Sequence, residues 1–224
     1  MLRSPTIVLL ALCCGLPSLA RAADTEDCRN GSFPTQEVVF GLAKVIGAPR
    51  IYLRSDTPPC PDESPACRGR VYVVPGDTVL TGVASGPYVC AFFAGRNGGS
   101  AGYVRQQEIA PQPVAAPASL AAWAGEWHNG DNSIELRSNG IRLTASGSAY
   151  WPSANPSLKD RPGGPNLGDM SGTAIPKANT VVFAGNDPSD CRVTLTLMPP
   201  FLLAVDNMQC GGMNVSFTGV YRKR

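Results

Sequence analysis

The sequence predicts an all-β protein stabilised by disulfides. Its 224 residues include 24 glycines and 21 prolines and few long helical patterns, which argues against a mainly helical chain. Val193, Leu195 and Leu197 alternate with polar residues, as in a strand that buries one face. An even number of cysteines in a chain that begins with an export-like segment points to paired thiols.

Residues 1–22 have the layout of a secretory signal peptide. Arg3 precedes an apolar run over residues 7–12, and the small-residue pattern Ala20-Arg21-Ala22 follows it. The run is too short for a spanning helix, and no later stretch approaches the roughly 20 apolar residues that a bilayer needs. We therefore expect a periplasmic or secreted protein with a cleaved signal peptide and no integral membrane segment.

The charge of the mature chain is near neutral. Without Arg3 and Arg21, the 19 basic residues become 17, against 17 acidic ones. Binding to nucleic acid requires a basic surface, which this composition does not supply. We therefore expect no nucleic-acid partner.

Six cysteines remain when Cys13 and Cys14 leave with the signal peptide: Cys28, Cys60, Cys67, Cys90, Cys191 and Cys210. Six thiols allow many pairings. Cys191 lies at the entry to one predicted strand and Cys210 just beyond the end of the next, where an up-and-down pair brings its ends together. We expect these two to form a disulfide.

The first half of the chain predicts a small barrel. Residues 35–44 fit either a short amphipathic helix or a strand. Five short strands with tight turns follow, over residues 50–53, 70–74, 78–83, 88–94 and 102–105.

Four phrases of this half resemble bacterial SH3-like domains, over residues 46–110. They are Tyr52-Leu53-Arg54, the turn Pro75-Gly76-Asp77 within residues 73–79, the aromatic strand Tyr88-Val89-Cys90-Ala91-Phe92 and the closing Gly102-Tyr103-Val104. The resemblance implies an SH3-like small barrel that binds extended ligands in an aromatic groove. The groove tyrosines would be Tyr52, Tyr72, Tyr88 and Tyr103.

An insert over residues 57–69 departs from the SH3-like pattern and carries Cys60 and Cys67. A disulfide within this loop would make its tip rigid and leave Cys28 to pair with Cys90. Residues 23–112 then form the first domain with its N-terminal extension. The proline-rich residues 113–119 are expected to be a linker, and residues 120–224 a second domain.

The second half predicts an antiparallel up-and-down barrel of about seven strands. Residues 133–137 and 141–145 form a hairpin signal with Asn139-Gly140 at its tip. A long polar loop over 150–171, a strand over 180–184 and a meander over 193–197, 201–205 and 213–220 follow.

The opening from Trp123 to Trp127 and the ending "DN..CGGMNV.F.GVY.R", residues 206–222, resemble a family of exported proteobacterial domains. Some of its members accompany lysozyme-inhibitor-like modules. Gly125-Glu126-Trp127 is also similar to the Gly-x-Trp of lipocalin-type barrels. These likenesses imply a lipocalin-like small barrel with a binding or inhibitory role.

The sequence offers little catalytic chemistry. His128 is the only histidine, so a histidine-based metal site would lack partners. Ser100 lies in a G-x-S-x-G pattern, but a strand pattern follows it where a nucleophile elbow needs a helix. We expect no enzyme, no metal and no cofactor; an enzyme would need His128 beside Ser100 or a carboxylate pair.

Two further groups are candidate ligand-binding residues. Trp127, Tyr150 and Trp151 could line the mouth of the second barrel. Asp206, Asn207 and Asn214 could shape a recognition loop, or instead close a turn by side-chain hydrogen bonds.

These features predict an exported, non-enzymatic binding protein of the periplasm or cell envelope. The expected partner is a peptide, a cell-wall (peptidoglycan) fragment or a secreted hydrolase that it inhibits. The alternative is a lipocalin-like carrier of a small apolar ligand. It requires that the inward residues leave a cavity; these would be Leu136, Leu143, Leu195, Leu203 and Phe217.

Overall fold

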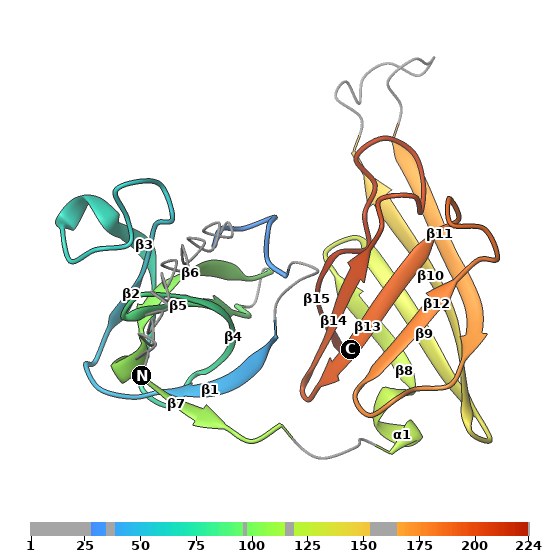
Figure 1. Cartoon of the computed structure of the whole chain (residues 1–224), viewed down its shortest axis with the longest axis horizontal. Helices are drawn as coiled ribbons and strands as arrows, with labels where there is room; N and C mark the ends of the chain where they lie inside the picture. The colour runs from blue at the N-terminus through green and yellow to red at the C-terminus, as the bar shows by residue number, and fades with distance from the viewer. Residues whose placement is uncertain (1–27, 35–38, 96–97, 115–118, 153–164, 224) are drawn as a thin grey trace, which may run out of the picture.

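The computed structural model describes residues 28–34, 39–95, 98–114, 119–152 and 165–223. Their strands form two antiparallel sheets that lie side by side (Figure 1). The signal peptide predicted for residues 1–22 lies outside the described residues. Within them, no helix has both the length and the apolar character needed to cross a membrane.

The first sheet has seven strands in the order β3-β2-β6-β5-β4-β1-β7, and we call it the β1–β7 unit. Its strands are β1 (Gly41–Val45), β2 (Ile51–Arg54), β3 (Arg68–Val73), β4 (Thr78–Ser85), β5 (Tyr88–Phe93), β6 (Ser100–Arg105) and β7 (Ile109–Gln112). The 3-10 turns η1 (Pro65–Cys67) and η2 (Gln106–Glu108) precede β3 and β7.

The strand interpretation of residues 35–44 is confirmed for residues 41–44, where the helix interpretation is wrong, while residues 39–40 precede the strand. β1 pairs with β4 on one side and with β7 on the other. Two ladders of backbone hydrogen bonds outweigh a short amphipathic pattern, because helix propensity is a weak prior that tertiary context overrides. Residues 35–38 lie outside the described part.

The second sheet is a nearly closed barrel of eight antiparallel strands, in the order β11-β10-β9-β8-β15-β14-β13-β12. We call it the β8–β15 barrel. Its strands are β8 (Gly125–Asn129), β9 (Asn132–Asn139), β10 (Arg142–Trp151), β11 (Asn166–Ala174), β12 (Thr180–Ala184), β13 (Arg192–Met198), β14 (Phe201–Asp206) and β15 (Gly219–Lys223). Helix α1 (Leu120–Trp123) lies at one end (Figure 1).

Two predictions for this barrel are wrong. The polar loop expected over 150–171 is strand at both ends, since β10 runs to Trp151 and β11 begins at Asn166; residues 153–164 lie outside the described part. The strand expected over 213–220 begins only at Gly219. The preceding residues form an irregular loop, in which Met213 is exposed while Val215 and Phe217 are buried.

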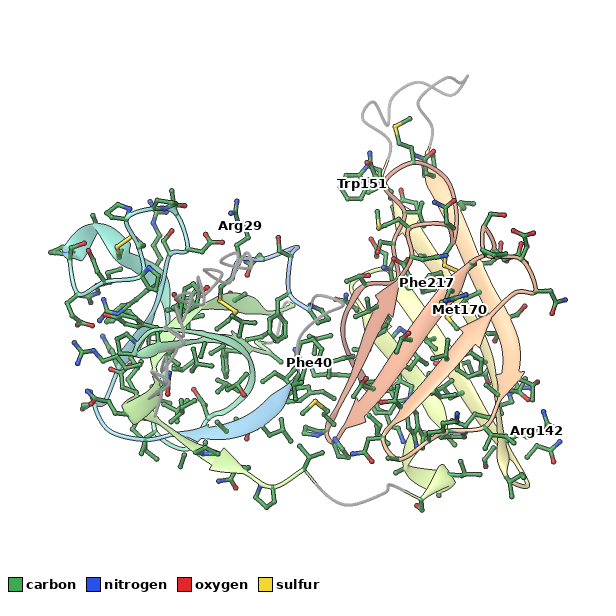
Figure 2. All side chains as sticks on the ribbon, viewed as in Figure 1. Arg29, Phe40, Arg142, Trp151, Met170 and Phe217 are labelled. Carbon is green, nitrogen blue, oxygen red and sulfur yellow. A yellow bond between two sulfur atoms is a disulfide. The ribbon has the colours of Figure 1, made fainter. Side chains whose placement is uncertain are left out.

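The interior of the β8–β15 barrel is filled by side chains. Leu136, Leu143, Leu195 and Phe217 belong to one buried cluster with Trp123 and Trp127. Met170 and Phe217 point into this interior (Figure 2), and a Cβ atom added at Gly147 would lie only 2.9 Å from Met170 Cγ and 3.0 Å from Phe217 Cε1. The inward position predicted for Leu203 is wrong, because Leu202 and Ala204 take the interior positions of β14 and turn Leu203 to the outer face.

The outer face of β14 is covered by the β1–β7 unit. Phe201 and Leu203 are buried in a second cluster that also contains Phe33 and Leu42. Phe40 lies between the two sheets (Figure 2) and packs edge-on against Phe33, with ring centroids 5.5 Å apart. The two sheets are therefore joined through apolar side chains as well as by the connecting segment.

Three disulfides cross-link the chain: Cys28–Cys90, Cys60–Cys67 and Cys191–Cys210. These are the pairs predicted from the sequence. Disulfides persist in oxidising compartments, so this framework fits an exported protein.

Candidate functional site

Tyr52 and Tyr72 form an aromatic pair on the surface of the β1–β7 unit. They are register partners on β2 and β3, and their ring centroids are 5.6 Å apart. Period-two alternation puts Ile51 and Leu53 into the core and Tyr52 on the outer face. Tyr72 is 41% exposed, which leaves its ring available to a ligand.

Two arginines lie on these rings. The guanidinium carbon of Arg68 is 3.5 Å from the Tyr52 ring centroid, and that of Arg50 is 5.0 Å from the Tyr72 centroid. Hydrogen bonding with Arg68, with a smaller contribution from Arg50, holds the pKa of the Tyr52 hydroxyl below its usual range. The aromatic pair therefore lies in a positive local field.

Glu63 connects the Cys60–Cys67 loop to the β1–β7 unit. Its carboxylate accepts hydrogen bonds from Arg54 at 2.8 Å, from Arg105 at 2.6 Å and from the Tyr88 hydroxyl at 2.5 Å. The bonds from Arg105 and Tyr88 lower the pKa of Glu63, and Glu63 in turn raises the pKa of Tyr88. The Glu63 carboxylate thus holds the long insert against three strands, β2, β5 and β6.

These residues border a hollow of about 350 Å³ between β2, the start of β3 and the Cys60–Cys67 loop. Its lining combines cations, carboxylates and an aromatic ring: Arg50, Ile51, Tyr52, Arg54, Glu63, Ser64, Pro65, Arg68 and Glu108. We call the hollow, together with the adjoining Tyr72, the tyrosine–arginine site. Its size and lining suit a short polar segment of a ligand rather than a drug-sized apolar molecule.

No family model, curated protein or solved structure matches the chain. The roles of the residues therefore follow from their geometry and chemistry.

Of the four predicted groove tyrosines, Tyr52 and Tyr72 lie together at the surface. Tyr103 is only 1% exposed and belongs to the buried cluster between the sheets. Tyr88 is buried too, and its hydroxyl is committed to Glu63. The aromatic surface available to a ligand therefore consists of two tyrosine rings, not the four that were predicted.

Trp127 does not lie with Tyr150 and Trp151. Its indole is buried, and its Nε1 donates to the carbonyl of Trp123 in α1 at 2.8 Å. Trp151 lies at the opposite end of the barrel (Figures 1 and 2) and is 47% exposed, beside Tyr150. Trp127 therefore belongs to the core, and only Tyr150 and Trp151 remain available at the other end.

Asp206 and Asn207 tie loops to the ends of β13 and β14. Asp206 is buried and accepts hydrogen bonds from the Phe217 amide at 2.7 Å and the Ser216 hydroxyl at 2.9 Å. Asn207 accepts from the Arg192 amide and donates to the Asp190 carbonyl. Asn214 adopts a φ of 66°, a turn conformation that asparagine tolerates. The geometry of this group fits turn closure.

Ser100 and His128 lie in different sheets. Ser100 begins β6, paired with Phe93, whereas His128 is in β8 with its Nε2 3.5 Å from the Glu126 carboxylate. Within the described residues, no group of three or more potential metal-ligating side chains comes together.

A larger hollow of about 590 Å³ lies along the outer face of β13 and β14 where the two sheets meet. Phe40, Arg192, Thr194, Leu203 and Asn207 are among its lining residues. Its walls are mostly hydroxyl and aliphatic groups, without a concentrated charge.

Arg50, Arg68 and Glu63 were not predicted as parts of a site. A signal for Arg50 was present, since Arg50, Tyr52 and Arg54 recur at every second residue and so share one face of a strand. Glu63 had no such signal, because it reaches Arg105 through the folded path of a disulfide-bonded loop.

Proposed function

We propose that this chain is an exported, non-enzymatic binding protein of the periplasm or cell envelope. Its β1–β7 unit would be an SH3-like module that holds an extended peptide or a peptidoglycan fragment. The observation that carries the proposal is the Tyr52–Tyr72 pair beside a polar hollow of about 350 Å³. Exposed aromatic pairs give extended ligands a rigid, apolar contact surface at low entropic cost.

Two observations support binding over the alternatives. Ser100 and His128 lie in different sheets, so they do not form a nucleophile and base pair. The packed interior of the β8–β15 barrel favours a structural core over a carrier cavity. The contact between the sheets also favours testing the full chain, because division near residue 113 would uncover Phe201 and Leu203.

The test is a pull-down of the mature, oxidised full chain with purified peptidoglycan sacculi and with the soluble muropeptides released from them as competitors. We expect binding that a Tyr52→Ala/Tyr72→Ala variant loses and a Tyr150→Ala variant keeps. Tyr150 is the matched control because it is a partly exposed tyrosine of the other sheet. Equal retention of all three proteins, or of none, contradicts the proposal.

A second candidate partner is a secreted hydrolase that the protein inhibits. Tyr150, Trp151 and Leu167 favour it, because β10 and β11 present them together at one end of the barrel, each at least 39% exposed. Aromatic anchors of this kind dominate protein interfaces. A lysozyme-type enzyme that is slowed by the protein, but not by a Trp151→Ala variant, would support this candidate. An enzyme rate unchanged at high protein excess would remove it.

A further inference from the structure

Arg50 and Arg68 have no acidic partner within the described residues. The ion pairs around the tyrosine–arginine site use Glu63, which is shared by Arg54 and Arg105. Glu108 instead accepts a hydrogen bond from the Arg105 amide at 2.9 Å. The contacts of Arg50 and Arg68 are with the tyrosine rings.

Stacking holds both guanidinium groups in place while leaving their donors available. A guanidinium has five N–H donors in a planar fork that matches a carboxylate. A side chain already fixed against an aromatic ring loses less conformational entropy when it binds a ligand. The two arginine side chains are therefore preorganised to bind an anion.

The hollow carries a local excess of positive charge. The mature chain has as many acidic as basic residues, yet three arginines and only two carboxylates line the hollow, and one of those carboxylates is already shared by Arg54 and Arg105. A long polyanion needs an extended basic surface, which a hollow of about 350 Å³ does not provide. A single anionic group on a small ligand fits it better.

We propose that Arg50 and Arg68 bind a carboxylate of a peptide ligand, while Tyr52 and Tyr72 pack against the adjoining apolar part. This inference rests on the proposed function and names the chemical class of its ligand. The carboxylate could be an acidic side chain or the free end of a peptide, and the two sources share the same recognition chemistry.

Four acetylated tripeptides distinguish these sources: alanine–glutamate–alanine and alanine–glutamine–alanine, each with a free C-terminal carboxylate or with a C-terminal amide. Each is titrated into the isotope-labelled, oxidised full chain and followed by the amide NMR signals of β2 and β3. We expect saturable shifts with the peptides that carry a carboxylate and none with the glutamine amide. Comparison of the two singly charged peptides shows which carboxylate is preferred.

Arg50→Gln and Arg68→Gln should each weaken binding of the preferred peptide by about tenfold, the effect of losing one charge-assisted hydrogen bond. Arg142→Gln is the matched control, since it removes the same charge from an exposed position on the other sheet (Figure 2). Amide signals outside the site should stay in place in all three variants, which separates loss of binding from loss of the fold.

The outcomes separate this inference from the function on which it rests. Equal binding of the glutamine amide and the peptides that carry a carboxylate, or unchanged affinity in both arginine variants, overturns the carboxylate assignment while retention on sacculi through Tyr52 and Tyr72 stands. No binding of any tripeptide while sacculi are retained also overturns the carboxylate assignment. No binding of tripeptides or sacculi overturns both.

Discussion

Glu63 is the residue that ties the Cys60–Cys67 loop to the β1–β7 unit. Because Arg105 and Tyr88 lower its pKa, its contribution to stability is complete above the pKa it has in the unfolded chain. The contribution is lost as the pH falls through the lower pKa of the folded chain. The wild-type protein should therefore lose stability on acidification partly through this group.

A Glu63→Gln variant should lose less stability than the wild type between neutral pH and about pH 3, because its amide does not titrate. Urea unfolding at a series of pH values measures this difference. Glu126→Gln, which changes an exposed carboxylate on the other sheet, is the control. Parallel curves for Glu63→Gln and wild type would show that the network has no part in acid sensitivity.

β11 depends on close contact between its backbone and the loop that follows β14. A Cβ atom at Gly168 would lie 2.3 Å from the carbonyl oxygen of Cys210 and 2.6 Å from a methyl carbon of Val215. Gly168 also forms an isolated bridge with Gly211. The Cys191–Cys210 disulfide fixes the same loop, so it has little freedom to move away.

Gly168→Ala should therefore lower the free energy of unfolding by about 1–3 kcal/mol, the usual cost of inserting a methyl group where backbone must shift. Urea or thermal unfolding followed by circular dichroism gives this value. Ser171→Ala, at an exposed position of the same strand, should change it by less than about 0.5 kcal/mol. Equal stabilities of the two variants would contradict the close approach.

The sequence predicts elements well where alternation and turn residues agree, as in β13 and β14. It fails for β11 because Gly168 and Gly172 occupy inward positions, where an apolar side chain would mark a strand. It also fails for residues 213–217, whose apolar residues alternate but whose path is set by hydrogen bonds to Asp206. In both places, contacts distant in sequence decide the structure.

The residues of the candidate site also divide into those that a local pattern predicts and those that distant contacts decide. Tyr52 and Tyr72 could be predicted because they share the outward face of adjacent strands. The burial of Tyr103 could not be predicted in the same way. It belongs to a buried cluster with residues of the second sheet, and the residues next to it in the sequence do not indicate that contact. Trp127 lies on the interior face of β8, in the buried cluster that also contains Trp123, and its Nε1 donates to the Trp123 carbonyl.

The two sheets share a buried apolar layer, in which Leu203 of β14 is only 1% exposed. Leu203→Ala should destabilise the whole chain by about 3 kcal/mol, within the range for removing a buried leucine side chain. The layer belongs to both sheets. The signals of tyrosines in the β1–β7 unit should therefore show the same loss of stability as the signals of tyrosines in the barrel. Denaturant unfolding, followed by these signals, measures it.

Val182→Ala is the control for this change, since Val182 is 45% exposed on the outer face of β12. It should leave the unfolding midpoint nearly unchanged. Destabilisation of the barrel alone in Leu203→Ala, with the β1–β7 unit unaffected, would show that the shared layer does not couple the two sheets.

β15 has a further importance that follows from its place between β8 and β14. It fills the gap between the first and second halves of the barrel sheet, and its Arg222 donates to the carbonyl oxygens of Gly95 and Gly98, which lie between β5 and β6 of the β1–β7 unit. Without β15, the buried apolar layer that contains Phe33 and Val220 is incomplete. The barrel can therefore join up and dock only when residues 219–223 are in place, so the last strand completes both the barrel and its contact with the β1–β7 unit.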